Sequence, residues 1–212
     1  YIFFSFCILI VVNGSNFIDG LNGLSIGYYF INLIIIFKLV NSLDYDLYNS
    51  IICNYLLILG CLIIFNFFNK LYLGDSGSYF IGLVVGFLLI NIYKQFSFIS
   101  SFYIILLLWY PCFENLFSIL RKYKFNLSPL KADNKHLHHL LFNFLQKKYN
   151  LSRLLANNLS SLIINFVNII FFYIGSVNIY NSYLQLTLIL TLIFIYSISY
   201  TYLFYFRYRF KN

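Results

Sequence analysis

Long apolar stretches alternate with short polar segments along the whole chain of 212 residues. Most of these stretches are close to 20 residues long, which is the length that an α-helix needs to cross a hydrocarbon layer of about 30 Å. The pattern predicts about six full membrane-spanning helices, over residues 25–40, 50–68, 78–93, 101–120, 155–174 and 184–206. We expect an all-α fold, a polytopic membrane helical bundle that forms a single integral membrane domain over residues 1–212.

The apolar run at the start of the chain, residues 1–12, is shorter than the others. A helix of this length rises only about 18 Å, which is too little to cross a membrane. The run lacks the basic start and the small-residue cleavage site of a signal peptide, and the sequence contains no Met. We therefore interpret residues 1–12 as the end of a partial first helix, and the chain as a fragment whose upstream helices are missing.

Composition supports the membrane assignment. Hydrophobic residues make up 61% of the chain and charged residues only 9%, whereas about a quarter of the residues in soluble domains are charged. The four cysteines lie in or beside apolar runs without the spacing of a zinc site, so we interpret them as small core residues. The expected surrounding partner is the lipid bilayer, and no nucleic-acid partner is expected.

Three polar islands carry the residue types that could support chemistry. Residues 13–24, with the sequence NGSNFIDGLNGL, include Asp19; residues 69–77 include Asp75 beside glycines; and residues 136–139 read HLHH. Asp, Asn and Ser beside glycines leave backbone amides able to approach a phosphate or a cation. Composition alone favours plain connectors between helices, but the recurrence of three such islands favours a common function.

The basic residues predict which side of the membrane these islands share. The polar segment 121–153 holds eight of the 14 Lys and Arg residues, so the positive-inside rule places it in the cytoplasm. Counting helices in both directions puts the other two islands on the same side, and the connector with Asp44 and Asp46 on the opposite side. A surface that combines Asp19, Asp75 and Asp133 with three histidines and many Lys and Arg residues suits an anionic substrate bridged by a metal ion.

Asp75 lies in the sequence GDSGS, just before a predicted membrane helix. Glycine amides and the positive end of the helix could hold a phosphate there, while the carboxylate holds Mg²⁺. The alternative is a helix cap, in which Asp75 or a neighbouring Ser closes the helix that begins near Ser78. The two interpretations are compatible with each other.

The HLHH segment places His136 and His139 on one face if it is helical, with His138 beside them. No cysteine lies close by to complete a zinc site, so contact between the imidazoles and phosphate oxygens fits the cationic surroundings better. The alternative is a solvated basic loop attracted to anionic lipid. Glu114 lies within an apolar run, where a carboxylate is costly, and we interpret it as a partner between helices.

The islands closely resemble the motifs of the polyprenyl-phosphate N-acetylhexosamine-1-phosphate transferases, membrane enzymes of glycosyltransferase family 4. NFIDGLNGLS is similar to the family's Asn-x-x-Asp-Gly loop, LGDSGSYFIG to its Gly-Asp-x-Gly-Ser loop, and SPLKADNKHLHHLL to its Ser-Pro and His-x-His-His segment. Order, spacing and sidedness agree over essentially the whole chain. The two helices after the histidines resemble the branch that initiates O-antigen and teichoic acid.

The resemblance implies a multi-pass protein of the bacterial inner membrane that faces the cytoplasm. It would transfer a sugar 1-phosphate from a UDP-sugar to polyprenyl phosphate, release UMP and so start a cell-envelope glycan. Mg²⁺, or alternatively Mn²⁺, would be the cofactor. A homodimer is compatible with the sequence.

Roles for individual residues are implied by the same resemblance. Asp19 and Asp75 would be catalytic, and Asp75 with Asn16 would bind the metal. The remaining substrate-binding residues would be Asn16, His136, His138, His139, Arg121 and Lys135.

Two departures from the family pattern affect the expected activity. The family's adjacent aspartate pair, carried on an earlier cytoplasmic segment, has no counterpart in these residues, and Asn22 stands where relatives often have Asp. An inactive relative or fragment that serves as an assembly partner is therefore one alternative. The other is a transporter that uses the polar loops as an ion path, which would require ionisable residues deep within the spans.

Overall fold

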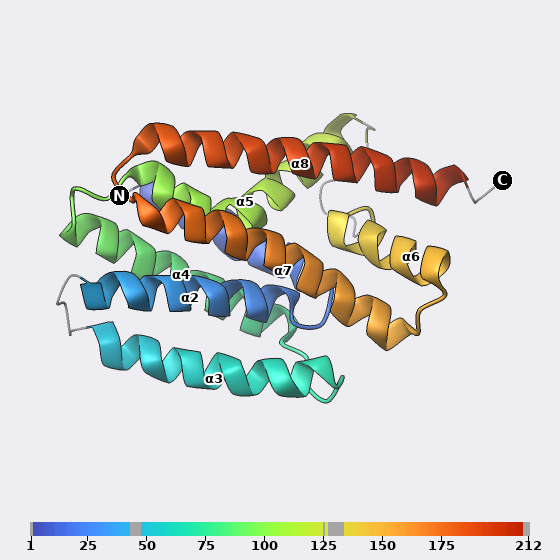
Figure 1. The fold of residues 1–212 in the computed structure, drawn as a ribbon, viewed down its shortest axis with the longest axis horizontal. Helices are drawn as coiled ribbons and strands as arrows, with labels where there is room; N and C mark the ends of the chain where they lie inside the picture. The colour runs from blue at the N-terminus through green and yellow to red at the C-terminus, as the bar shows by residue number, and fades with distance from the viewer. Residues whose placement is uncertain (1, 43–47, 125, 127–133, 210–212) are drawn as a thin grey trace.

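The computed structural model describes residues 2–42, 48–124, 126 and 134–209, and within these ranges it contains helices and no strands (Figure 1). The connector with Asp44 and Asp46, Asp133, and the Ser-Pro part of the third motif lie outside the described residues. The helices are α1 (Ile2–Ile18), α2 (Leu24–Ser42), α3 (Asn49–Phe67), α4 (Gly74–Gln95), α5 (Ser101–Lys124), α6 (Leu137–Tyr149), α7 (Arg153–Val177) and α8 (Ser182–Arg209).

Six of these helices are long and apolar enough to cross a membrane, namely α2, α3, α4, α5, α7 and α8, while α1 is apolar but shorter. The prediction of six full spans and one partial first helix is therefore confirmed. In lipid the backbone must satisfy its own hydrogen bonds, which explains why uninterrupted apolar runs become helices. The chain is that of a multi-pass membrane protein.

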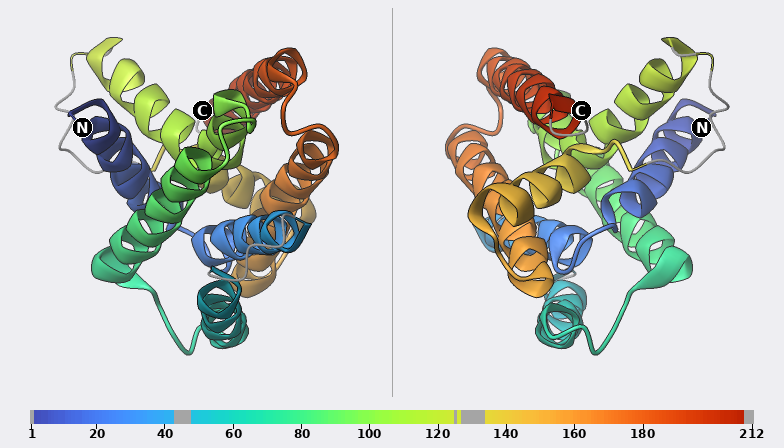
Figure 2. Two further views of the ribbon diagram at one scale, coloured as in Figure 1. Left: turned by 90° about the vertical axis from the view of Figure 1, so that its left-hand side faces the viewer. Right: turned by 90° about the vertical axis from the view of Figure 1, so that its right-hand side faces the viewer.

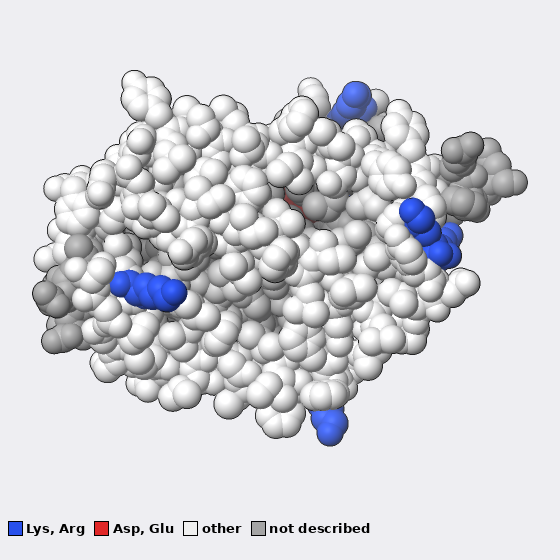
Figure 3. Space-filling model, viewed as in Figure 1, with Lys and Arg blue, Asp and Glu red and all other residues white. Residues whose placement is uncertain are grey.

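The outer surface is apolar, as expected for helices that face lipid. Large side chains such as Leu57 on α3, Phe166 on α7 and Phe194 on α8 are exposed. The face in Figure 3 is mostly free of charged residues, with a few scattered Lys and Arg and one small acidic spot inside a hollow. A soluble protein rarely exposes so much contiguous apolar surface.

Small residues allow the helices next to the site to pack closely. α1 packs against α4 and α5, and a Cβ atom on Gly14 of α1 would overlap the backbone carbonyl of Pro111 in α5. On the other side of α1, a Cβ on Gly82 of α4 would overlap the Ser15 hydroxyl. Gly14 and Ser15 thus bring three helices together just before the Asp19 loop.

Several helix ends differ from the prediction. α1 continues to Ile18, so the first island is helical up to that residue and its loop is only residues 19–23. Within this helical part Ser15 is buried, donates to the carbonyl of Val11 in its own helix at 2.7 Å, and is hydrogen-bonded to the Tyr29 hydroxyl of α2. α4 begins at Gly74, earlier than predicted, and places Asp75 in its first turn.

The polar segment 121–153 is also more structured than its composition suggested. Its first residues form the last turn of α5, and most of its second half is α6. α6 buries Leu137, Leu140 and Leu145 and packs against α7 and α8. Figure 2, right, looks onto this end of the molecule, where α6 lies across the view.

Candidate active site at one end of the bundle

The loop after α1 lies directly against the histidine cluster. A Cβ atom on Gly20 would come within 2.5 Å of His138 Nε2 and 3.0 Å of His139 Cε1. The Asp19 loop and the start of α6, separated by more than a hundred residues, are thus in contact. Only a residue without a side chain leaves both imidazoles in their places.

The second island meets the first through Asn16, in the last turn of α1. Its amide nitrogen donates to the Tyr79 hydroxyl at 2.9 Å, and its amide oxygen accepts from the Ser78 hydroxyl at 3.4 Å. These contacts fix the end of α1 to the first turns of α4, where Asp75 lies. The three islands, which the sequence predicted to share one side of the membrane, thus lie together at one end of the bundle in the residues that the structure describes.

A polar cavity of about 670 Å³ lies between these segments. Its lining comes from the end of α1, the loop between α1 and α2, the end of α3 with the loop that follows it, the start of α4 and the first turns of α7. Its lining residues with ionisable or amide side chains are Asn16, Asp19, Asn22, Asn66, Asn69, Asp75, Arg153 and Asn157.

The two carboxylates of the cavity are close enough to influence each other. Burial and, to a smaller extent, the negative charge of Asp75 together raise the pKa of Asp19 to about 7. Asp75 itself is exposed to the cavity. A partly buried carboxylate beside a second one is an environment that a cation would stabilise.

The residues present fit a magnesium ion better than a zinc ion. Among the described residues, no group of three or more His, Cys, Asp or Glu side chains is arranged to hold a metal. Mg²⁺ does not need such a group, because it keeps several waters and usually takes one or two carboxylates together with substrate phosphates. Asp75, Asp19 and the amide of Asn16 line one cavity and offer oxygen ligands.

The capping alternative for Asp75 is wrong. Leu73 is the N-cap of α4, and no side chain provides a capping hydrogen bond there. Ser78 lies one turn inside the helix and donates to the carbonyl of Asp75 at 2.9 Å. The carboxylate of Asp75 is therefore not used to close the helix.

The three histidines form one compact cluster at the start of α6. Ring centroids are 4.3 Å apart for His138 and His139, 5.6 Å for His136 and His138, and 6.2 Å for His136 and His139. His138 is completely buried, and neither of its ring nitrogens has a hydrogen-bond partner among the described residues. Burial, followed by the neighbouring imidazoles His139 and His136, holds the pKa of His138 well below its usual value.

An unpartnered buried imidazole is uncommon in folded proteins, since it loses its hydrogen bonds to water without replacement. His138 Nε2 lies against the Asp19 loop at Gly20, which is one of the residues that line the polar cavity.

Two charged residues of α5 hold the chain around His136. Glu114 is fully buried and bonds to His136 Nδ1 at 2.9 Å, which confirms its interpretation as a partner between helices. Arg121 is also buried and donates to the Lys135 carbonyl at 2.6 Å. Lys135 itself is half-buried.

The pairing of Glu114 with His136 was not predicted from the sequence. The one signal that could have indicated it is the cost of placing a carboxylate in an apolar helix, which requires a polar partner.

Two asparagines that the sequence analysis did not single out, Asn66 and Asn157, fix the loops of the cavity. Asn66 accepts from the Gly23 backbone amide at 2.5 Å and donates to the Leu71 carbonyl at 2.7 Å, so it joins the loop between α1 and α2 to the loop after α3. Asn157 of α7 accepts from the Asn22 amide at 2.7 Å. The chain contains many asparagines, so these two did not stand out in the sequence.

Comparisons with known proteins agree with the geometry. Residues 1–93 match the sequence model of glycosyl transferase family 4. The chain is 34% identical over 140 residues to a probable undecaprenyl-phosphate N-acetylglucosaminyl 1-phosphate transferase of Bacillus subtilis, a match that covers 63% of the chain and 38% of that protein. It is 31% identical over 152 residues to a decaprenyl-phosphate N-acetylglucosaminephosphotransferase of Mycolicibacterium smegmatis, a match that covers 62% of the chain and 37% of that protein.

The chain thus spans well under half the length of these curated relatives. No solved structure gives a significant match to it. The family match covers α1 to α4, with both the Asp19 loop and Asp75, and the matched relatives are enzymes of the kind that the motifs indicated. Over residues 1–93 the chain is similar to glycosyl transferase family 4.

Proposed function

We propose that the protein transfers N-acetylhexosamine 1-phosphate from a UDP-sugar to polyprenyl phosphate. A phosphate oxygen of the lipid attacks the phosphorus that carries the sugar. The bond from that phosphorus to the oxygen of UMP breaks, UMP leaves, and a lipid-linked pyrophosphate remains. The names of the two relatives favour N-acetylglucosamine and an undecaprenyl or decaprenyl lipid.

The observation that carries this proposal is the contact between Gly20 and the imidazoles of His138 and His139. It brings a carboxylate loop and a cationic segment to one end of an apolar bundle. A phosphate attacking a pyrophosphate needs neutralisation of charge and alignment more than it needs an activated nucleophile. A site of this composition at a helix-bundle end suits a reaction between a soluble nucleotide and a membrane lipid.

We assign roles by position: Asn16, Asp19 and Asp75 line the polar cavity, and His138 and His139 lie against Gly20 in its wall. Asp75 and Asn16 bind the metal, and Asp19 acts next to the nucleotide or the attacking phosphate. His136, His138 and His139 contact the pyrophosphate, with Lys135 as a nearby cation. Arg121 binds the protein backbone beside His136, so we assign it to positioning this segment.

Mg²⁺, when bound, would neutralise the pyrophosphate and orient it for in-line displacement. The chain's own contribution is to hold two carboxylates and three imidazoles around one ligand. The excess of basic residues at this end favours the cytoplasmic side of a bacterial inner membrane.

The test uses the purified full-length protein with UDP-N-acetylglucosamine, polyprenyl phosphate and Mg²⁺. We expect release of UMP together with a lipid-linked sugar pyrophosphate. Asp75→Ala should abolish both products, and Lys94→Ala, an exposed residue in the last turn of α4, should leave them unchanged. Absence of product from the wild type with every common UDP-sugar would refute the proposal.

The alternatives make different predictions in the same experiments. A transporter would give ion flux in liposomes without transfer of sugar phosphate. An inactive relative would bind a UDP-sugar or a partner protein without releasing UMP. Product formation that depends on Asp75 excludes both as the main function.

A further inference from the structure

The buried carboxylate of Glu114 joins three parts of the protein. Its Oε1 atom accepts from His136 Nδ1 at 2.9 Å and from the Leu137 amide at 3.3 Å. Its Oε2 atom accepts from the Tyr196 hydroxyl of α8 at 2.7 Å. A carboxylate with no exposure to solvent requires such partners, because burial of an unpaired charge is very costly.

Arg121, two turns further along α5, contacts the residue on the other side of His136. Its Nη1 atom donates to the Lys135 carbonyl at 2.6 Å and to the Tyr200 hydroxyl of α8 at 3.1 Å. The backbone on both sides of His136 is thus held by side chains of α5, and each of these is in turn held by a tyrosine of α8.

The arrangement controls the orientation and tautomer of the His136 ring. Since Nδ1 is bonded to a carboxylate, it carries the proton, and the ring would contact a ligand through Nε2. Removal of the partners that fix a metal-binding imidazole in this way typically changes affinity or activity by about 10–100-fold, and we expect an effect of the same order for an imidazole that contacts a phosphate.

We propose that Glu114 is the positioning residue for His136, and that Tyr196 supports it from the last helix of the chain. This inference rests on the proposed function, in which His136 contacts the pyrophosphate. Glu114 does not touch the reacting atoms. Its role is to hold one imidazole at the angle and in the tautomer that the transfer needs, and so to make α8 a part of the active-site architecture.

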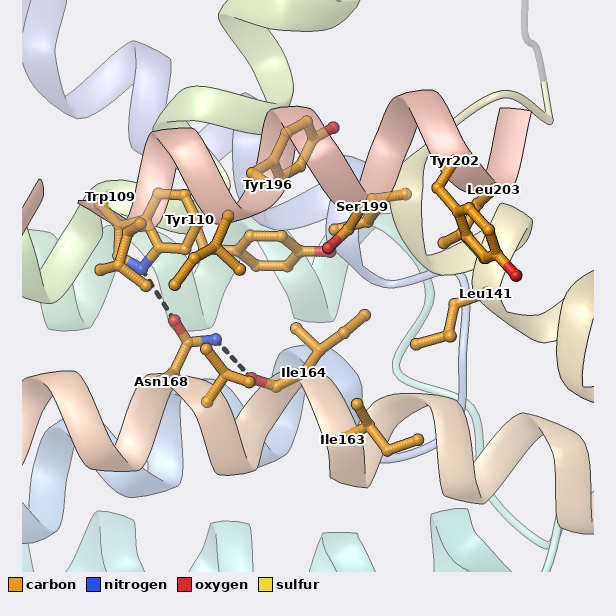
Figure 4. Close-up of a pocket in the computed structure, with 14 residues that line it drawn as sticks. Trp109, Tyr110, Leu141, Ile163, Ile164, Asn168, Tyr196, Ser199, Tyr202 and Leu203 are labelled. Carbon is orange, nitrogen blue, oxygen red and sulfur yellow. Dashed lines mark hydrogen bonds between the residues drawn. The ribbon is translucent and has the colours of Figure 1, made fainter. Parts of the chain in front are cut away.

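Glu114→Gln tests this in the full-length protein, because the amide keeps the shape and the acceptor but removes the charge. Tyr196→Phe removes one of the three hydrogen bonds. Asn168→Leu is the matched control, because Asn168 of α7 accepts from Trp109 of α5 at 2.8 Å, a buried hydrogen bond between helices that does not involve the histidines (Figure 4).

Two quantities are measured for each variant, the steady-state kinetics of UMP release and the ¹⁵N NMR signals of labelled histidines. The signal of His136 is identified by its loss in His136→Gln. We expect Glu114→Gln to lower kcat by about 10–100-fold with little change in KM and to shift the Nδ1 signal, because a charge-assisted hydrogen bond becomes a neutral one. Tyr196→Phe should cause a smaller change of both quantities in the same direction.

The control should lower the melting temperature without altering the His136 signal or kcat. An unchanged His136 signal in an otherwise active protein with Glu114→Gln would overturn the positioning role alone. Equal losses of activity in Glu114→Gln and Asn168→Leu would overturn it as well. A wild type that releases no UMP would instead overturn the proposed function.

Discussion

Gly20 and His138 lie so close that residue 20 can have no side chain without displacing the imidazole: a Cβ atom would be 2.5 Å from Nε2. The contact joins the first polar loop to the start of α6.

Gly20→Ala should reduce transfer strongly while the fold persists. The backbone of Gly20 is not in the left-handed region, so alanine adds little strain, but its methyl group must push His138 or His139 aside. A displacement of about 1 Å in a catalytic group can lower the rate by about 100-fold. The rate of UMP release measures the loss of activity, and the melting temperature shows whether the fold persists.

Gly60→Ala on α3 is the control, because its Cβ would lie 3.7 Å from Phe30, an ordinary contact. This variant should keep full activity. If Gly20→Ala retained wild-type kcat, the close contact would have no role in the reaction.

His138→Leu should separate stability from activity. The buried imidazole has no hydrogen-bond partner among the described residues, so an apolar side chain of similar volume removes two unsatisfied polar atoms. We expect an equal or higher melting temperature together with loss of transfer. A lower melting temperature with retained activity would show that His138 serves the fold only.

Magnesium should stabilise the wild type and fail to stabilise Asp75→Asn. A ligand present at about 100 times its dissociation constant stabilises the folded state by about 2.7 kcal/mol, and loss of a carboxylate ligand removes most of this gain. The measurement is the melting temperature at increasing Mg²⁺ concentrations, compared with the melting temperature in EDTA. Lys94→Ala is the control and should show the same rise in melting temperature as the wild type. An identical Mg²⁺ response in Asp75→Asn would exclude Asp75 as a metal ligand.

Asn66→Ala should destabilise the protein and impair the cavity. Its buried side-chain amide is hydrogen-bonded to the Gly23 N–H and the Leu71 carbonyl. Alanine leaves these two backbone groups unsatisfied, and a buried group of this kind lowers the free energy of unfolding by about 1–3 kcal/mol. We expect a lower melting temperature and a raised KM for the UDP-sugar. Asn54→Ala, at an exposed position of the same helix, should change neither, and equal effects of the two substitutions would contradict the bridging role of Asn66.

Helix ends show where sequence reasoning was insufficient. The polar residues of the first island predicted a loop from residue 13, yet α1 continues to Ile18 because Gly14 and Ser15 pack against α4 and α5. Polarity predicts exposure only on average; a small polar residue is also suited to close helix packing. The same limitation applies to Asp75, which the sequence placed before a helix and the structure places within its first turn.

The sequence by itself determined the number and approximate position of the membrane helices, and the three polar islands that line up on one side. It could do so because hydrophobicity over about 20 consecutive residues is a local property, and a backbone in lipid has few alternatives to the helix. Only the tertiary structure decided that Gly20 touches His138, that Glu114 holds His136, and that α8 supports both α5 and α6. Those contacts join residues far apart in the chain, and they depend on how the side chains of several helices pack, which no local pattern encodes.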